Sequence, residues 1–294
     1  MSAIDSHVHL WDLQRTPQPW IDASMTVIDR DFGLAELAEH LAVTGAGSAV
    51  VVQVDHSLEE SEWMLDQAAA SAQVAGVVGW VDLDGDPSAG LARLGHHAAA
   101  DRLVGIRHLA HVDADPSWLV RPGVIAGVRA LGVAELAFDL VVRDHQLPLA
   151  AALAAAAPDT TLVLDHLGNP QLGAPSIHEW ARELRALADH DRVVAKLSGL
   201  TLEAARASDP AARLREAVDV ALEVFGPNRL MVGSDWPLVL LDDGGGGDNG
   251  HDGDVRWAST LVDLLGQLSP SERELITRAT AIASYGLGDR EAAE

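Results

Sequence analysis

The sequence of 294 residues contains no cysteine, and its single lysine is Lys196. Without cysteine the chain can form no disulfide, thiol nucleophile or thiolate metal site. Basic residues are scarce as well, because 20 of them stand against 44 acidic ones and leave a formal charge of −24. This charge repels nucleic acids and anionic membrane surfaces, so we expect neither as a partner.

Long apolar runs are also absent. No run approaches the roughly 18 residues that a spanning helix needs, and the opening MSAIDSHVHLWD lacks the basic and apolar regions of a secretory signal. No G-x-G-x-x-G follows the first predicted strand and no P-loop pattern occurs, so dinucleotide and P-loop binding have no support. Hydrophobic residues still make up 48% of the chain. We therefore expect a globular, cytoplasmic protein, either a monomer or a homo-oligomer.

Short apolar runs rich in β-branched residues predict eight strands, and helix-compatible stretches lie between them. The predicted strands are 3–12, 48–55, 75–83, 102–109, 135–142, 160–168, 192–200 and 229–237. The predicted helices are 33–45, 57–72, 87–100, 146–157, 176–190 and 211–226. Eight repeats of strand and helix favour a parallel sheet closed into a distorted (β/α)8 TIM barrel over an open, doubly wound sheet. We expect one domain over residues 1–294.

Two segments near the end of the chain have a different composition. The glycine-rich stretch 244–254 follows the eighth predicted strand and is expected to be a loop, either a lid over the site or slack between elements. The stretch 270–288 follows Ser269, which begins an S-x-x-E helix signature. We expect this stretch to form a C-terminal helix outside the barrel.

Two histidines in the first predicted strand point to a site. Side chains at the carboxyl ends of barrel strands form the active site, and the period of two along a strand places His7 and His9 on one face. The alternative is a pair of unrelated core histidines that are satisfied by hydrogen bonds. Because the two lie in a D-x-H-x-H arrangement on an apolar first strand, we favour the site.

Two further predicted strands end on residues of the same chemistry. His166 precedes a turn with glycine and proline at the end of 160–168, while Asp165 is expected on the opposite face of that strand. The alternative is that these two residues only form a polar strand end. Asp235 ends the eighth predicted strand, where a carboxylate after a buried run must be paired, hydrogen-bonded or functional.

Three imidazoles and one carboxylate can perform two kinds of chemistry. They can bind a divalent metal, or they can polarise a carbonyl while the carboxylate activates water. The residues alone do not decide between metal binding and metal-free polarisation of a carbonyl. A two-metal site is disfavoured because the only lysine, Lys196, lies on the seventh predicted strand and none is available on the fourth to bridge two ions.

The order of motifs along the chain resembles a known family. The motifs are IDSHVHLWD (4–12), VVQVD (51–55), VVGWVDL (77–83), GIRHL (105–109), FDLVV (138–142), QLP (146–148), LVLDHLGNP (162–170), KLSGL (196–200) and RLMVGSDWP (229–237). Together they resemble the amidohydrolase superfamily, and within it the lactonase branch of amidohydrolase family 2, over nearly the whole chain. One departure is Asn169, where the family often has lysine.

The resemblance implies a hydrolase that opens a small-molecule lactone with water, in carbohydrate catabolism. The implied substrates are sugar-acid lactones such as fuconolactone or rhamnonolactone, or pyrone and muconolactone relatives. It implies Asp235 as the general base, with His7, His9 and His166 polarising the lactone carbonyl. The same four residues would ligate a metal, zinc before others, if the enzyme uses one.

The resemblance also suggests substrate-binding residues. Arg107 would hold a substrate carboxylate or hydroxyl, although a structural salt bridge is an equal alternative. Pocket walls are expected from Gln53, Trp11, His108 and Trp236. Two other functions remain open: a metal-dependent decarboxylase of the same superfamily, and a barrel that binds a sugar acid without catalysis.

Overall fold

The computed structural model of the chain describes residues 2–243 and 252–288 and shows a sheet of eight parallel strands in sequential order. The strands are β1 (Ala3–Val8), β2 (Ala46–Val52), β3 (Val74–Gly79), β4 (Leu103–His108), β5 (Ala137–Leu140), β6 (Leu162–Leu164), β7 (Val193–Leu197) and β8 (Leu230–Val232). The backbone N–H of Asp235 donates to the carbonyl of His7 at 2.9 Å, and that of His9 to the carbonyl of Trp236 at 2.7 Å. These bonds join the first strand to the last, so the predicted barrel is confirmed.

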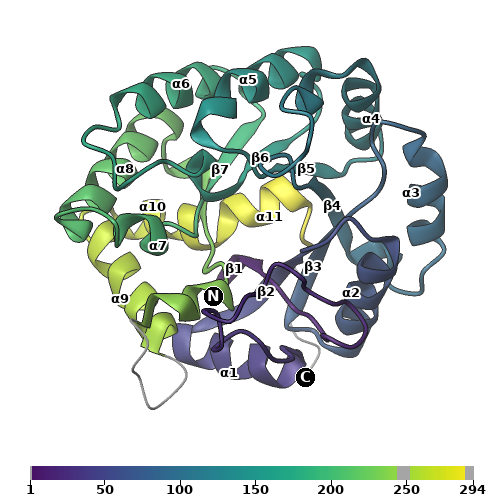
Figure 1. Cartoon of the computed structure of the whole chain (residues 1–294), viewed down its shortest axis with the longest axis horizontal. Helices are drawn as coiled ribbons and strands as arrows, with labels where there is room; N and C mark the ends of the chain where they lie inside the picture. Colours follow the sequence, from purple (N-terminus) through teal and green to yellow (C-terminus); the bar gives the residue numbers. More distant parts are fainter. Residues whose placement is uncertain (1, 244–251, 289–294) are drawn as a thin grey trace.

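Helices surround the sheet and alternate with its strands (Figure 1). They are α1 (Leu34–Thr44), α2 (Leu58–Ala70), α3 (Pro87–Gly95), α4 (Pro122–Val133), α5 (Leu147–Ala156), α6 (His178–Ala188), α7 (Thr201–Ala204), α8 (Pro210–Phe225), α9 (Asp252–Leu265), α10 (Pro270–Glu274) and α11 (Thr280–Tyr285). Local sequence explains where two of these helices begin, because the Ser57 and Asp209 side chains cap α2 and α8 by accepting hydrogen bonds from backbone N–H groups. None of the helices in the described ranges has the length and apolar character needed to cross a lipid bilayer.

The structure corrects several predicted boundaries. Every predicted strand is present but most are shorter, because the polar residues after the apolar runs belong to loops. Helix α4 was not predicted. Residues 252–254, expected in the glycine-rich loop, form the start of α9. The rest of that loop, 244–251, lies outside the described residues, so the expectation of either a lid or a simple connecting loop there stays a prediction.

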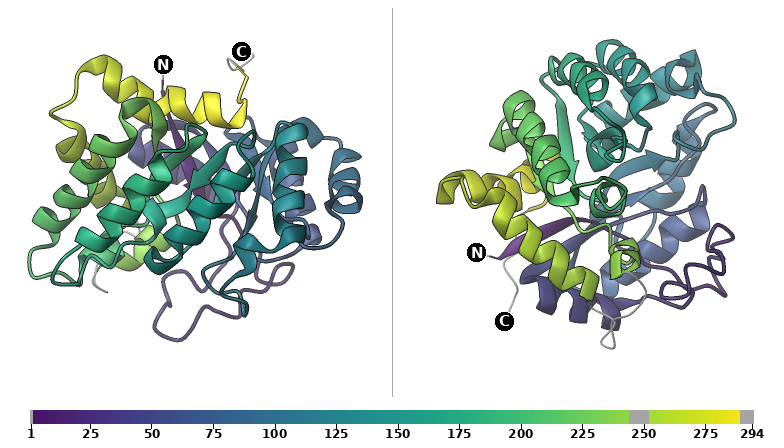
Figure 2. Two further views of the ribbon diagram at one scale, coloured as in Figure 1. Left: turned by 90° about the horizontal axis from the view of Figure 1, so that it is seen from above. Right: turned by 60° about the vertical axis from the view of Figure 1, so that its left-hand side comes forward.

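The C-terminal segment closes one end of the barrel. Helix α11 lies across the end of the barrel where the strands begin (Figure 2). The long loop between β1 and α1 lies at the opposite end. Its Ala281 and Tyr285, followed by Leu287, pack with Ile4, Val78 and other apolar residues of the barrel interior. The segment is divided into α10, a π-helical turn (Leu275–Ala279) and α11, where one outer helix was expected. The opposite end of the barrel stays accessible to ligands.

Candidate active site

His7 and His9 lie together at the carboxyl end of β1. Both side chains are buried, and their Nε2 atoms are 3.2 Å apart. The Nδ1 atom of His9 lies 2.8 Å from the carbonyl oxygen of Val52, which can only accept, so Nδ1 carries a hydrogen. Burial lowers the pKa of His9, and the neutral ring therefore directs the lone pair of Nε2 toward His7.

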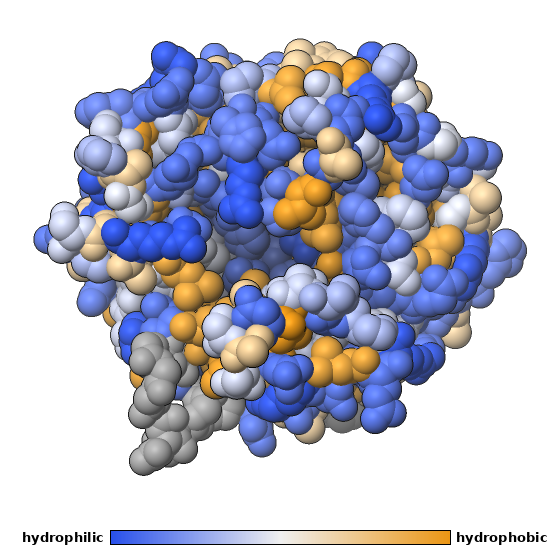
Figure 3. Space-filling view, viewed as in Figure 1, coloured by the Kyte–Doolittle hydropathy of each residue, from blue (hydrophilic) through white to orange (hydrophobic). Residues whose placement is uncertain are grey.

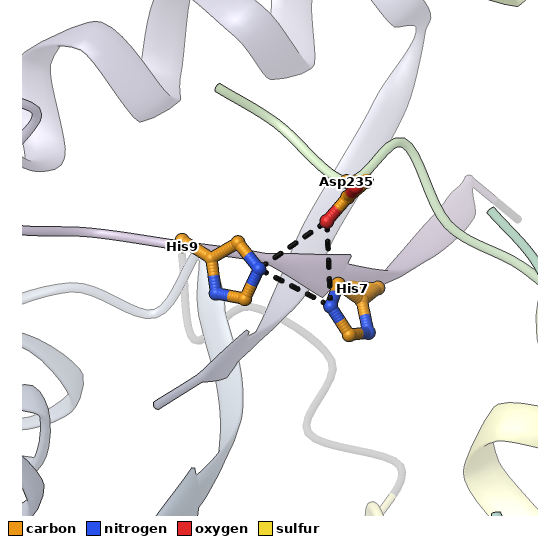
Figure 4. A group of neighbouring side chains, drawn as sticks. All are labelled: His7, His9 and Asp235. Carbon is orange, nitrogen blue, oxygen red and sulfur yellow. Dashed lines mark hydrogen bonds and ion pairs between the residues drawn. The ribbon is translucent and has the colours of Figure 1, made fainter. Parts of the chain in front are cut away.

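Asp235 joins the two histidines from the end of β8 (Figure 4). Its Oδ1 atom lies 3.3 Å from Nε2 of His9 and 3.6 Å from Nε2 of His7. Burial opposes the ionised form, but the nearby His166 outweighs it and holds the pKa of the Asp235 carboxyl below its usual range. A buried carboxylate therefore faces two imidazoles, as the strand ends predicted.

His166 reaches the same point by an unusual backbone path. Strand β6 ends at Leu164, and His166 has φ 53° in the turn that follows. Its Nε2 atom lies 3.9 Å from Oδ1 of Asp235, and its Nδ1 atom lies 2.9 Å from the hydroxyl of Ser198. The ring centroid is 4.6 Å from that of His7. The structure thus brings all four predicted catalytic residues together.

The expected orientation of Asp165 is wrong. Asp165 lies inside the barrel, where its Oδ1 is 3.2 Å from Nδ1 of His7 and its Oδ2 accepts from Arg107 at 3.0 Å. Val163 belongs to the barrel interior, so the period of two along β6 places Asp165 inside as well. The strand pairing ends before His166, which turns inward through its left-handed conformation. Two consecutive residues can therefore serve one site.

The site has the donor atoms and spacing of a metal centre. His7, His9 and Asp235 form one group that could hold a metal ion, each offering one ligand atom. Imidazole nitrogens and a carboxylate oxygen are zinc ligands, and ligands about 2.0–2.1 Å from a tetrahedral zinc ion lie roughly 3.3 Å from one another. The separations of 3.2, 3.3 and 3.6 Å agree with this value. The residues present therefore fit one zinc ion, with His166 as a candidate fourth ligand.

A second set of charged residues lies directly beneath the histidines. Lys196 is fully buried, and its Nζ atom is 2.6 Å from Asp139, 2.9 Å from Asp165 and 3.0 Å from Nδ1 of His7. The hydroxyl of Tyr285, from α11, donates to Asp139 at 2.8 Å. These residues were not assigned a role in the site from the sequence. The sequence did contain a sign of this buried charge, because a charged residue interrupts each of the apolar runs FDLVV and VVAKL.

A cavity of about 380 Å³ leads to the histidines from the open end of the barrel, where Figure 3 shows a hollow in the surface. Its lining residues include the predicted catalytic residues His9, His166 and Asp235, and the predicted substrate-binding residue Arg107. Further lining residues that were not predicted include Trp20, His111, Arg143, Asn169, Leu202 and Glu203. This volume is in the range of pockets that hold small ligands.

Two tryptophans expected in the pocket wall are core residues. Trp11 and Trp236 are 0% and 1% exposed, and both pack edge-on against Phe32 with ring centroids 5.4 and 5.1 Å apart. Neither is among the described residues that line the cavity. Trp11 and Phe32 belong to the long loop between β1 and α1, and Trp20 from the same loop lies at the cavity instead. Loop packing of this kind is not visible in the sequence.

The other two expected wall residues lie behind the pocket. The Gln53 side chain is fully buried and donates to the backbone carbonyl of Arg107 at 3.2 Å. His108 stacks on Trp118 with ring centroids 3.6 Å apart and contacts Asp113 at 2.8 Å. Among the residues the structure describes, neither contributes to the lining of this cavity. Arg107 alone of the five expected binding residues lines it, and it also forms the salt bridge with Asp165.

Gly199 is required by the geometry of the site. It has φ 62°, and a Cβ atom there would lie 2.6 Å from Nδ1 of His166 and 3.1 Å from Asp235. We expect Gly199→Ala to displace both side chains and to lower kcat/KM for the lactone hydrolysis that the family resemblance implies by about 10²-fold, since a misplacement of about 1 Å can have this effect. The measurement is steady-state kinetics of the purified variant.

Gly45→Ala is the matched control, because Gly45 has φ 73° and a Cβ atom added there would meet nothing within 4 Å. This change introduces the same left-handed strain, about 1–2 kcal/mol, without a clash. Its kcat/KM should match that of the wild type. An equal loss of activity in both variants would show that strain, and not displacement of the site, causes the effect.

His40 supports the site from behind β1. Its Nε2 atom lies 2.9 Å from Asp5 and its Nδ1 atom 3.0 Å from Asp254. Asp5 in turn accepts from the backbone N–H groups of His7 and Ser234. Burial opposes the charged ring, but the contacts with Asp254 and Asp5 outweigh it and raise the pKa of His40 to about 9. The imidazolium therefore ties together β1, α1 and α9.

This raised pKa predicts a pH-dependent stability. A pKa above the unfolded value of about 6.5 stabilises the fold fully below pH 6.5, and the contribution disappears as the pH rises through about 9. We expect a loss of about 3 kcal/mol in the free energy of unfolding from this group. Urea titrations at pH 6.5 and 10 would measure it. His40→Asn should abolish this part of the pH dependence, whereas His145→Asn, at an exposed position, should retain it.

The fold and site define a class of protein: a barrel enzyme whose strand ends bring together three histidines and one aspartate. The chain belongs to the Amidohydrolase family, whose profile matches residues 4–287. It is 35% identical over 295 residues to an L-fucono-1,5-lactonase from Burkholderia multivorans, covering 97% of this chain and 96% of the relative. It is 33% identical to an L-fucono-1,5-lactonase from Burkholderia ambifaria, covering 98% of each.

A solved structure supports the same assignment. The chain superposes with a TM-score of 0.86 on the crystal structure of an amidohydrolase from Burkholderia multivorans with bound zinc. The two share 32% sequence identity, and the match covers 97% of this chain and 99% of the other. The family resemblance predicted from the motifs is therefore confirmed.

Proposed function

We propose that this protein hydrolyses the ring ester of a sugar-acid lactone. The observation that carries the proposal is the ionised Asp235 carboxylate, which faces the cavity within 3.9 Å of three imidazoles. The similarity to two L-fucono-1,5-lactonases supports the substrate class. A lactone carbonyl needs an activated water and a group that stabilises the oxyanion, and the cavity offers residues for both.

Asp235 acts as the general base in this proposal. Its carboxylate accepts a hydrogen bond from the attacking water, takes one proton as the water adds to the carbonyl, and returns it to the ring oxygen as the ring opens. The low pKa keeps the carboxylate ionised at neutral pH. Its left-handed backbone, with φ 62°, aims the side chain at the histidines from the end of β8.

His7, His9 and His166 act on the carbonyl side of the reaction. His7 and His9, with Asp235, would hold a single zinc ion, and His166 would be a fourth ligand or lie beside the ion. When bound, the ion supplies a Lewis acid that polarises the lactone carbonyl. Without a metal, His7 and His166 can donate hydrogen bonds to the oxyanion, whereas the hydrogen of His9 is on Nδ1 and bonds to Val52. The three histidines and Asp235 are proposed as the catalytic residues.

The cavity walls suit a polyhydroxylated ring. Arg107 and Arg143 offer donors, Glu203 and Asn169 offer acceptors, and Trp20, which is 37% exposed, offers an apolar ring. Arg107 already pairs with Asp165, which reduces its capacity to hold a substrate carboxylate. We therefore propose a small neutral sugar-acid lactone as the ligand before a dicarboxylate.

The test is a lactone screen with a pH indicator, run with and without a chelator, because ring opening releases acid. The panel contains neutral sugar-acid 1,5- and 1,4-lactones and aromatic or dicarboxylate lactones. We expect turnover of neutral sugar-acid lactones, with a loss of activity in chelator that added zinc restores. Thermal stabilisation by these lactones without acid release would contradict hydrolysis and favour a binding protein.

A further inference from the structure

The Nδ1 atom of His7 lies between a donor and an acceptor. On one side the Lys196 ammonium lies 3.0 Å away in hydrogen-bond geometry. On the other side Oδ1 of Asp165 lies 3.2 Å away. An ammonium group only donates and an ionised carboxylate only accepts, so the two neighbours favour opposite states of Nδ1.

Each state of Nδ1 fixes the state of Nε2 at the other side of the ring. Burial lowers the pKa of His7 well below its usual value, so the ring is neutral and carries one hydrogen. If Nδ1 accepts from Lys196, the hydrogen is on Nε2 and points at Nε2 of His9, 3.2 Å away. If Nδ1 donates to Asp165, Nε2 has a lone pair at the mouth of the site, and Nη1 of Arg107 lies 3.4 Å from it. Only the second tautomer can ligate a cation through Nε2.

Asp165 has the capacity to accept this hydrogen. Its Oδ2 atom accepts from Arg107 at 3.0 Å, while its Oδ1 atom is buried and, beyond its ion pair with Lys196, makes no hydrogen bond within the described part of the chain. Burial opposes ionisation, but Lys196 and His7 hold the pKa of Asp165 well below its usual range. A charged, buried oxygen with an unused lone pair therefore lies beside Nδ1.

Lys196 is fixed in position, so it can compete with Asp165 for a hydrogen bond with Nδ1 of His7. Two of its three hydrogens face Asp139 at 2.6 Å and Asp165 at 2.9 Å, which leaves the third for His7. Asp139 is itself fixed by the hydroxyl of Tyr285 at 2.8 Å. The lysine is fully buried, so it cannot turn this hydrogen toward solvent. The network thus provides a defined partner for Nδ1 in either tautomer.

We propose that Lys196 and Asp165 are positioning residues that select the tautomer of His7, and that Asp165 accepts the Nδ1 hydrogen when a divalent cation binds at Nε2. The proposal rests on the metal-ligand assignment of the proposed function. The change moves one proton from Nε2 to Nδ1 by exchange with solvent water. His7 is neutral in both forms, so the protein gains and loses no net proton.

The first test observes the tautomer directly. Histidine labelled with ¹⁵N would be incorporated, and long-range ¹H–¹⁵N spectra would be recorded on chelator-treated protein before and after one equivalent of zinc, with the His7 signals assigned from a His7→Gln variant. We expect the Nδ1 signal of His7 to change from the unprotonated to the protonated type. Nδ1 of His9, which donates to Val52, should stay protonated and serves as an internal reference. A His7 Nδ1 signal of the same type before and after zinc would overturn the proposal.

The second test measures zinc affinity by competition with a chromophoric chelator. Asp165→Asn keeps the shape of the side chain but removes the charge that accepts the hydrogen. We expect it to weaken zinc binding about 10- to 100-fold, as is typical when the partner of a ligating histidine is changed. Asp189→Asn is the control, because it makes the same chemical change at an exposed position near the end of α6, and its affinity should match that of the wild type.

The outcomes separate this inference from the proposed function. Unchanged zinc affinity in Asp165→Asn, or an equal loss in Asp189→Asn, would overturn it. Failure of the wild type to bind zinc would overturn it together with the metal-ligand assignment, but not lactone hydrolysis, which the indicator screen measures separately.

Discussion

Asp235→Asn is expected to lower kcat for lactone hydrolysis by roughly 10²- to 10⁴-fold, the usual contribution of a general base. The amide preserves the shape of the side chain but cannot take the proton of the attacking water. Since Asp235 is also a candidate metal ligand, the zinc content of the variant must be measured beside its kinetics. With zinc in excess, the loss in kcat should persist.

The control for this variant is Asp189→Asn, the same chemical change at an exposed position near the end of α6. Its kcat and thermal midpoint should equal those of the wild type. Should Asp235→Asn retain wild-type kcat, the assignment of Asp235 as the base would be wrong, and one of the histidines would have to activate the water.

Lys196→Met should have the largest effect on stability. The lysine is the only side chain whose cation contacts both Asp139 and Asp165 within the described residues, and all three are fully buried. Removing one partner of a buried ion pair leaves an uncompensated charge and typically costs about 3–5 kcal/mol. Urea unfolding at pH 7 would measure the change, with equal m-values needed for the comparison.

Tyr285→Phe tests the same network more mildly. It removes one hydroxyl that donates to Asp139 but leaves the ammonium in place. We expect a loss of about 1–2 kcal/mol, the usual effect of a missing hydrogen bond to a buried charged group. A loss in Lys196→Met no larger than in Tyr285→Phe would mean that the buried aspartates become protonated and do not need the lysine's charge.

Much of the site was contained in the local sequence. The repeated apolar runs specify strands because a parallel sheet covered by helices buries both of its faces, and eight repeats close the sheet. The polar residues at the ends of the first, sixth and eighth runs then had to meet at one end of the barrel. His7, His9, His166 and Asp235 could be named for this reason, before any contact was known.

The pocket walls could not be named in the same way. Trp11 and Trp236 lie near His9 and Asp235 in the sequence, yet both are buried against Phe32 from the loop between β1 and α1. Trp20, from the same loop, lines the cavity. Which aromatic ring faces the ligand depends on how a long loop packs, and no periodicity governs such a loop.

The sequence by itself determined the barrel, the order of its strands and the four side chains at its mouth, because strand periodicity and chain order act locally and repeat. Only the tertiary structure decided the partners of those side chains. Asp139, Lys196 and Tyr285 lie far apart in the chain and meet only because the barrel closes and α11 covers the end of the barrel opposite the site. His166 and Asp165 face one site because the backbone becomes left-handed at His166, after β6 has ended. This conformation depends on the surrounding structure, and the residue types do not predict it.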